Sequence, residues 1–130
     1  MASFGPRSLS QLATCDVRLQ NLFEAVVKRF DCSVLEGYRG EERQNMLFDM
    51  EQSKVRFPTG RHNSRPSKAV DVVPYPVEWE NRERFILFAG FVQGIANEMG
   101  IRIRWGGDWD GDWDTKETRF FDAPHFEIDE

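Results

Sequence analysis

The sequence has little cysteine and no long apolar run, and each scarcity excludes a class of protein. Cys15 and Cys32 are the only cysteines, too few for the disulfide framework that stabilises small secreted domains. We therefore expect both to be reduced thiols. The longest apolar stretch, residues 85–92, is far shorter than the ~20 residues that span a bilayer, so no membrane insertion is expected. The first residues also lack the apolar core of a signal peptide, which predicts a protein folded in a cytoplasm.

Basic residues are scarce relative to acidic ones. The 130 residues include 17 Lys and Arg against 22 Asp and Glu, a net charge of −5, which argues against nucleic-acid binding. No repeat or coiled coil is visible, so a structural virion protein is not favoured. A hydrophobic content of 40% with 30% charged residues is ordinary for a globular protein. The length predicts one domain, residues 1–130, with a core that needs no disulfides.

Hydrophobic periodicity predicts a small α+β fold, with helices packed on a central antiparallel sheet. Longer helices are expected at residues 16–30, 41–51 and 79–99, and strands at residues 32–35, 69–73, 101–105 and 125–128. Ser8 and Ser10 are candidate caps for a short helical turn, and Gly100 is placed to end the last helix. Polar segments at residues 52–67 and 106–118 are expected to be loops.

Only two histidines occur, and each lies near a carboxylate where a loop is predicted to meet a strand. His62 precedes Asp71, and His125 follows Asp122 by three positions. Two imidazoles and one carboxylate, here His62, His125 and Asp71, form the ligand set of a catalytic Zn²⁺ that keeps its fourth position for water. Such a site lowers the pKa of the water to about 7. Asp122 is placed to take the proton of that water.

Spacing alone leaves a simpler explanation open. A histidine beside an aspartate is more often a hydrogen-bonded surface group than half of a metal site. The HExxH signature of many zinc proteases is also absent from the sequence. The metal site therefore needs further support.

Four separated motifs, in a fixed order, provide that support. They are Glu36-Gly37-Tyr38-Arg39 with Gln44; His62 with residues 69–74; Trp105-Gly106-Gly107-Asp108-Trp109; and Asp122-Ala123-Pro124-His125-Phe126-Glu127. Together they resemble the D-alanyl-D-alanine carboxypeptidase/L-alanyl-D-glutamate peptidase family of zinc peptidases, and within it the phage endolysin branch. The resemblance extends over residues 8–128. It implies a hedgehog/D,D-peptidase-like α+β domain that acts as a monomer.

Site residues follow from the resemblance by motif position. His62, Asp71 and His125 are implied as ligands of one Zn²⁺ per chain, and Asp122 as the general base. The family's matching arginine lies in the active-site cleft, so Arg39 is expected to stabilise the oxyanion or bind a substrate carboxylate. A surface ion pair of Arg39 with Glu41 or Glu42 is the alternative. Further residues expected to contact the substrate are Tyr38, Gln44 and Trp109.

The sequence departs from the family pattern around the first ligand. Gly60 stands where the family's first motif has a serine. Eight residues, rather than the usual six, separate His62 from Asp71. We expect the two extra residues to bulge near residues 65–66 without moving either ligand.

A second departure is the extension of the Trp-Gly-Gly-Asp-Trp motif by residues 110–117. Aspartate occurs there at every second position, from Asp108 to Asp114. An EF-hand beginning at Asp108 would need glycine and glutamate where Trp113 and Arg119 stand, so this site type is rejected. A solvated rim and a looser Ca²⁺ site remain as interpretations.

The resemblance predicts an enzyme that hydrolyses the L-Ala–D-Glu bond of bacterial peptidoglycan and lyses the host of a bacteriophage. Such an enzyme would accumulate in the cytoplasm of the infected cell and reach the wall through a separate pore, a holin. One alternative is a D,D-carboxypeptidase that releases terminal D-Ala. Another is an inactive, zinc-stabilised binding module, against which Asp122 argues because zinc binding alone needs no base.

Overall fold

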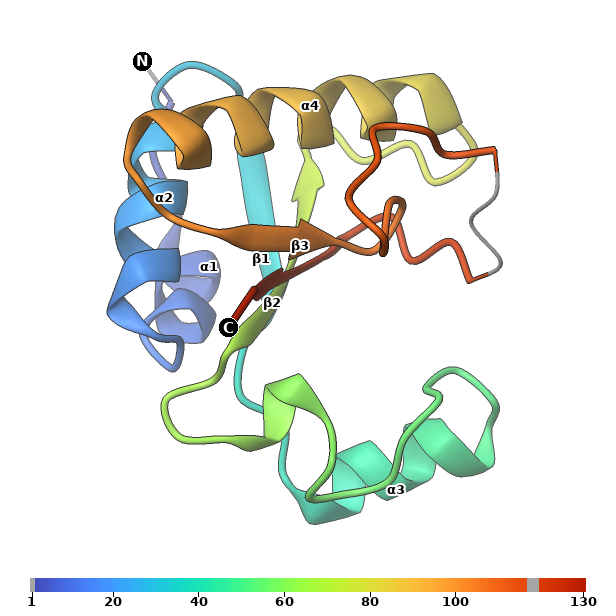
Figure 1. Cartoon of the computed structure of the whole chain (residues 1–130). Helices are drawn as coiled ribbons and strands as arrows, with labels where there is room; N and C mark the ends of the chain where they lie inside the picture. The colour runs from blue at the N-terminus through green and yellow to red at the C-terminus, as the bar shows by residue number, and fades with distance from the viewer. Residues whose placement is uncertain (1, 117–119) are drawn as a thin grey trace.

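A four-stranded antiparallel sheet organises the computed structural model, which describes residues 2–116 and 120–130 (Figure 1). The elements in chain order are α1 (Pro6–Leu12), α2 (Val17–Val27), β1 (Cys32–Glu36), α3 (Glu41–Asp49), the 3₁₀ turn η1 (Arg61–Asn63), β2 (Ala69–Pro74), α4 (Arg82–Glu98), β3 (Ile103–Trp105) and β4 (His125–Ile128). The predicted α+β fold class is confirmed. Within the described residues, no helix is long and apolar enough to cross a membrane.

The strand order β1-β2-β4-β3 places β2 and β4 at the centre of the sheet. Both central strands are almost entirely buried, which agrees with their rich content of Val, Ile and Phe. In the register of β2 and β4, Asp71 lies directly opposite His125. On β1, an irregularity between Val34 and Glu36 brings Glu36 opposite Asp71. One row across three strands therefore carries three polar residues: Glu36, Asp71 and His125.

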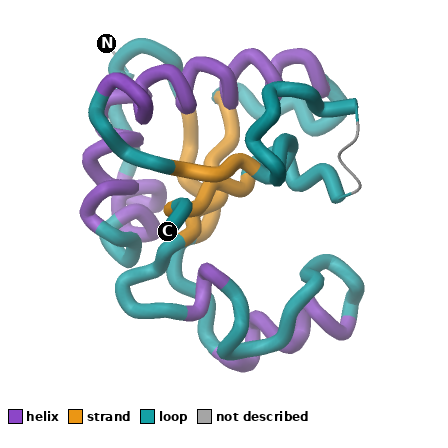
Figure 2. Tube along the Cα trace, viewed as in Figure 1, coloured by secondary structure: helices purple, strands orange, loops and turns teal. Residues whose placement is uncertain are grey.

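The hydrophobic core lies between the sheet and the helices α2 and α4, which pack against each other (Figures 1 and 2). The ring of Phe126 on β4 forms edge contacts with Phe23 of α2 and Phe88 of α4. All three rings are buried. Cys15 and Cys32 are free and buried, and burial raises the pKa of Cys15 to about 11. The cysteines are thus free thiols of the core.

The predicted helices were too long at their ends. Helix α2 begins after Asp16, whose side chain caps the helix by accepting the N–H of Arg18. It ends at Val27 because two N–H groups, those of Arg29 and Phe30, donate to the same carbonyl of Val26, which closes the last turn. Helix α4 starts three residues later than predicted, because Asn81 is its N-cap.

Two smaller predictions concern caps. Ser8 and Ser10 do not begin a helix: Gly5 is the N-cap of α1, and Ser8 lies inside the helix, where its hydroxyl accepts the N–H of Val34. Gly100, in contrast, follows the C-cap of α4 with a φ of +72°. Its left-handed conformation is the one that glycine adopts most readily, so its predicted role is confirmed.

Helix α3 and the chain up to residue 66 lie apart from α1, α2 and α4 (Figure 1). We call residues 41–66 the lobe. Leu47 is its only buried apolar side chain among the described residues, whereas Met46 and Met50 on the same helix are exposed. The lobe faces the row of polar residues on the sheet, and the space between them is the candidate site.

Candidate active site

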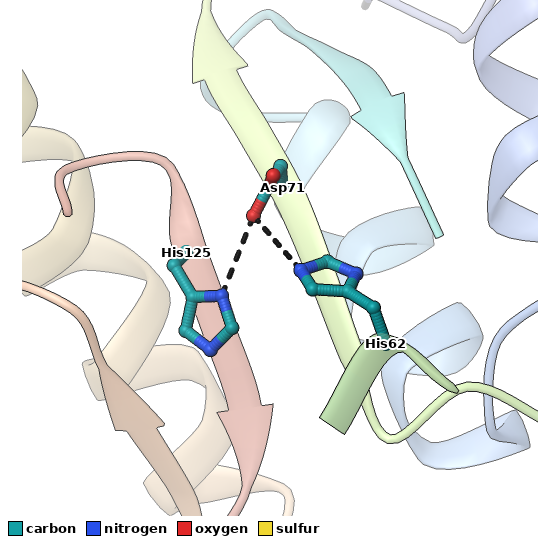
Figure 3. A group of neighbouring side chains, drawn as sticks. All are labelled: His62, Asp71 and His125. Carbon is teal, nitrogen blue, oxygen red and sulfur yellow. Dashed lines mark ion pairs between the residues drawn. The ribbon is translucent and has the colours of Figure 1, made fainter. Parts of the chain in front are cut away.

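Three side chains from separate segments converge at the sheet (Figure 3). The Nε2 atom of His62 is 3.3 Å from Oδ1 of Asp71, and Nδ1 of His125 is 3.5 Å from the same oxygen. The three atoms lie within 4.8 Å of one another. Zn–ligand bonds of about 2.0–2.2 Å place the ligands of a tetrahedral site roughly 3.3–3.6 Å apart. The spacing of the two histidine nitrogens from the carboxylate therefore fits one small dication.

The fold explains why these residues meet. Asp71 and His125 face each other across the β2–β4 ladder, and directly opposed residues project to the same side of a sheet. His62 comes from the turn η1, where its carbonyl accepts the N–H of Arg39 at 2.7 Å. This bond attaches η1 to the segment that follows β1. The bulge predicted at residues 65–66 is thus compatible with close contact between His62 and Asp71.

Hydrogen bonds behind each histidine determine which nitrogen faces the site. The carbonyl oxygen of Gly37 lies 2.7 Å from Nδ1 of His62; since a carbonyl only accepts, Nδ1 carries the proton. Glu127 lies 2.8 Å from Nε2 of His125, and the carboxylate accepts in the same way. The lone pairs of Nε2 on His62 and Nδ1 on His125 are therefore directed at Asp71. Metal-ligating histidines use the same supporting contacts.

The facing atoms lack hydrogen-bond partners. Among the described residues, Nε2 of His62 and Oδ1 of Asp71 are buried side-chain atoms with no hydrogen-bond partner. Two acceptors this close need a cation or a proton between them. Burial by itself would lower the pKa of His125, but the neighbouring carboxylates of Asp71 and Glu127 raise that pKa to about 9. The site thus attracts positive charge, and its residues fit a divalent metal ion.

Asp122 lies at the edge of this group. Its Oδ2 is 3.9 Å from Nδ1 of His125, and its side chain is 31% exposed, so it faces the solvent-accessible side. Burial and the negative charge of Asp71 raise the pKa of Asp122 above its usual value. A carboxylate with a raised pKa beside a metal site is suited to taking a proton from water and giving it up again.

Gly106 holds the segment that carries Asp122. Its N–H donates to the carbonyl of His125, and its own carbonyl accepts the N–H of Asp122, both at 2.8 Å. A Cβ at position 106 would collide with the carbonyl oxygen of Asp122. The Trp-Gly-Gly motif, far from Asp122 in sequence, is therefore required for the close backbone approach that positions this carboxylate.

Known proteins resemble this chain in sequence and in fold. A family model described as phage L-alanyl-D-glutamate peptidase matches residues 1–128. The chain belongs to this peptidase family. It is 28% identical over 139 residues to the L-alanyl-D-glutamate peptidase of Escherichia phage T5, covering 96% of each protein. The crystal structure of Serratia marcescens L-Ala D-Glu endopeptidase ChiX aligns with a TM-score of 0.77 and 28% identity, over 98% of this chain and 91% of the other.

In this member of the phage peptidase family, a cavity of about 600 Å³ opens beside the candidate metal ligands. His62, Asp71, Asp122 and His125 line one side, and residues of α3 and of the segments 52–55 and 59–61 line the other. Trp109 also lines the cavity, with its ring centroid 5.3 Å from that of His125. Its indole N–H donates to the carbonyl of Phe120, so the ring forms a fixed wall.

Arg39 lines the cavity as expected from the sequence, but its ion pairs are not those considered for a surface arginine. Its guanidinium pairs with Glu36 at 2.9 Å and Asp71 at 3.4 Å, rather than with Glu41 or Glu42. Its Nη1 also donates to Gln44. The side chain is 10% exposed. Arg39 is thus bound to the carboxylate of Asp71, a candidate metal ligand, as well as facing the cavity.

Two other predicted substrate contacts have different surroundings. Gln44 is completely buried, and its amide donates to Ser53 and Val55 while its oxygen accepts from Arg39 and Asn63. The hydrogen bonds of the Gln44 side chain are therefore made to the lobe and to Arg39. Tyr38 does not line the cavity; its ring lies 4.1 Å from the guanidinium of Arg65.

Sequence reasoning assigned no role to three residues that support the site. Glu127 is the partner of His125, Glu36 is the partner of Arg39, and the carbonyl of Gly37 orients His62. Glu127 had a detectable signal, because residues two apart on a strand share a face. Buried at 5% exposure, it has an additional ion pair with Arg104. The role of Gly37 has no sequence signal, since it depends on a backbone atom.

The aspartates of the extension form a second cluster, in which Asp108, Asp110 and Asp112 approach one another. Here the carboxylates accept hydrogen bonds from the loop's own backbone: Asp108 from the N–H groups of residues 112 and 113, and Asp112 from that of residue 114. This turn-forming role accounts for their alternating spacing. Residues 117–119, at the end of the predicted loop, lie outside the described residues.

Proposed function

We propose that this peptidase is a zinc-dependent endopeptidase that hydrolyses the L-Ala–D-Glu bond of the peptidoglycan stem peptide. One observation carries the proposal. The buried, unpartnered atoms of His62 and Asp71 face each other beside His125, with the raised-pKa carboxylate of Asp122 at the open side. Membership of the phage L-alanyl-D-glutamate peptidase family supports the choice of bond. Two imidazoles and one carboxylate support zinc as the ion.

In the proposed mechanism, Zn²⁺ held by His62, Asp71 and His125 would supply Lewis-acid chemistry to the scissile carbonyl and to water. Asp122 accepts a proton from the attacking water and passes it to the nitrogen of D-Glu as the peptide bond breaks. The raised pKa of Asp122 makes the first transfer, from water to the carboxylate, easier than it would be to an ordinary aspartate. Glu127 and the carbonyl of Gly37 keep the two imidazoles in the required tautomers.

Arg39 has a positioning role in this proposal. Its ion pair keeps Oδ2 of Asp71 occupied, which leaves Oδ1 directed at the histidines. The part of the Arg39 side chain that stays exposed faces the cavity, where the guanidinium can stabilise the oxyanion or a substrate carboxylate. Trp109 contributes a flat wall against the substrate, whereas Gln44 acts indirectly by holding Arg39 and the lobe.

The test is mass spectrometry of purified muropeptides after digestion, with and without a chelator. We expect chelator-sensitive release of peptides with a new N-terminal D-Glu, restored by Zn²⁺. Loss of a single D-Ala would instead identify a D,D-carboxypeptidase. Absence of cleavage by the folded, zinc-loaded protein would identify a binding module and overturn the proposal.

We further propose that residues 1–130 act as one monomeric domain in the cytoplasm of an infected cell, and that a holin gives access to the wall. Family membership among phage peptidases supports this route. Expression in host cells with and without a co-expressed pore tests it: lysis should require the pore, and wall degradation without one contradicts the proposal. Sedimentation of the purified protein should give a mass near 15.2 kDa.

A further inference from the structure

A second, smaller cavity lies on the other side of Asp122. This groove, of about 400 Å³, is lined by Trp79, Arg82, Phe85, Phe121 and residues 122–124. Asp122 is the one residue that lines both this groove and the metal-side cavity among the residues described for each. The two cavities therefore border the same carboxylate, and a substrate that reaches the metal can extend into the groove.

The groove presents an aromatic platform with an adjacent cation. The indole of Trp79 stacks on Phe85, with centroids 5.7 Å apart and planes inclined by 24°, yet Trp79 remains 59% exposed. The guanidinium of Arg82 lies 3.8 Å from the centre of the Phe121 ring. Within the described part of the chain, no carboxylate forms an ion pair with Arg82. Its N–H groups are therefore available to carbonyl oxygens of a ligand.

The proposed substrate has a sugar close to the cleaved bond. L-Ala is the first residue of the stem peptide, and its nitrogen is acylated by the lactyl group of N-acetylmuramic acid. One residue spans at most about 3.6 Å, so the lactyl carbonyl and the sugar follow the scissile carbonyl almost at once. An enzyme that cuts this bond must accommodate a saccharide immediately beside its metal.

The opposite side of the substrate is anionic. D-Glu is linked through its γ-carboxyl, so its α-carboxylate is free next to the leaving nitrogen. On the metal side of Asp122, the cavity is lined by both cations and carboxylates. Among the cations, Lys54 lies over the Phe120 ring, and no carboxylate of the described residues pairs with it. Its ammonium group is therefore available to the α-carboxylate of D-Glu, whereas the groove offers an exposed aromatic face.

We infer that the groove of Trp79 and Arg82 is a saccharide subsite for the muramyl sugar that carries the stem peptide. The indole face of Trp79 stacks on the sugar ring, and Arg82 donates to the lactyl or N-acetyl carbonyl. D-Glu and the residues after it then occupy the metal-side cavity. This inference rests on the proposed function and adds the direction in which the substrate lies.

Two substrates with the same peptide test the subsite. One is a disaccharide muropeptide with GlcNAc–MurNAc on L-Ala, and the other is the same peptide with a simple N-acetyl group. For the wild-type protein, we expect kcat/KM to be about tenfold higher with the disaccharide. Trp79→Ala should remove this preference by raising KM for the disaccharide substrate, while cleavage of the sugar-free peptide stays unchanged. Trp79→Tyr keeps an aromatic ring at this position, so this variant should retain most of the preference in kcat/KM for the disaccharide substrate.

A control variant separates this effect from a general loss of structure. Leu87 is 64% exposed on α4 and does not line the groove, so Leu87→Ala should keep the wild-type preference. Arg82→Gln should reduce the preference less than Trp79→Ala. Equal kcat/KM values for both substrates in the wild type, or an equal loss on both in Trp79→Ala, would overturn the subsite and leave the peptidase function standing. Cleavage of neither substrate by the wild type would overturn the proposed function itself.

Discussion

The two walls of the metal-side cavity are held together by different forces. The sheet wall belongs to a core of buried apolar side chains that extends from Phe4 to Ile128, and no residue of the lobe is part of that core. The lobe instead depends on polar contacts around Gln44 and on bonds such as that from the Asn63 amide to the carbonyl of Arg39. Polar contacts exchange with water at little net cost, so the lobe is the easier of the two to move.

The proposed metal ligands come from both regions. Asp71 and His125 lie on central strands, whereas His62 lies in the lobe. A bound metal would therefore do two things at once: it would supply chemistry, and it would fasten a loosely held lobe to a rigid sheet.

On the sheet side, Asp122→Ala should remove the proposed base without disturbing the fold. We expect kcat to fall by about 10³-fold, within the usual range for loss of a general base. Metal content and thermal stability should match the wild type, because Asp122 is neither a core residue nor one of the three ligands. Steady-state kinetics and elemental analysis check this; near-native turnover would show that another group is the base.

The loss of one apolar side chain should lower the free energy of unfolding more in the core than in the lobe. Phe126→Ala should lower the free energy of unfolding by about 4 kcal/mol, because Phe126 is completely buried among the rings of Phe23 and Phe88. Leu47→Ala in the lobe should cost no more than about 2 kcal/mol, since Leu47 is not part of the hydrophobic core. Urea titrations measure both values. Equal losses would mean that the lobe is part of the same cooperative core.

Metal removal should loosen the lobe selectively. At a free zinc concentration of 100 times Kd, binding stabilises the folded state by about 2.7 kcal/mol. After chelation, amide hydrogen exchange should accelerate most in residues 41–66, while amides of β2 remain protected. His62→Ala should reproduce this pattern without a chelator. Uniform acceleration across the sheet and lobe would contradict the division into two regions.

The smallest effect on stability is expected at Asp16, which lies where the chain leaves the lobe and meets the helices. Asp16 pairs with Arg18 and Lys68, and hydrogen bonds from Arg18 hold the pKa of Asp16 well below its usual value. A carboxyl whose pKa is depressed by folding stabilises the protein above its unfolded pKa of about 3.9 and loses that contribution as the pH falls further. Asp16→Asn keeps a capping side chain, so it should cost only about 1 kcal/mol at pH 7.

Thermal unfolding from pH 7 to pH 2 measures the contribution of Asp16. The difference in stability between the wild type and Asp16→Asn should be constant from pH 7 to about pH 5. It should then shrink as the pH falls further, because the wild-type carboxyl becomes protonated and loses its ion pairs. A gap as large at pH 2 as at pH 7 would show that the ion pairs of Asp16 are not its source.

Local patterns predicted the elements better than their ends. The apolar spacing of residues 85–96 was enough to predict α4, because a helix that packs on a core repeats its buried residues every three to four positions. The same spacing placed the start of α4 at Trp79, whereas Asn81 caps the helix and Trp79 lies outside it. An aromatic residue before the cap can pack on the helix without belonging to it, and hydrophobicity does not distinguish the two cases.

The α+β class, the principal helices and strands, and the residue types able to bind zinc could be predicted from the sequence, since these depend on composition, periodicity and motif order. Tertiary structure alone decided that Asp71 lies opposite His125, which nitrogen of each histidine faces inward, and that Arg39 is bound to Asp71 rather than free. The tertiary structure also decided that Gln44 is buried and that Tyr38 lies outside the cavity. These outcomes depend on strand register and on backbone carbonyls such as that of Gly37, which arise only when distant segments pack together.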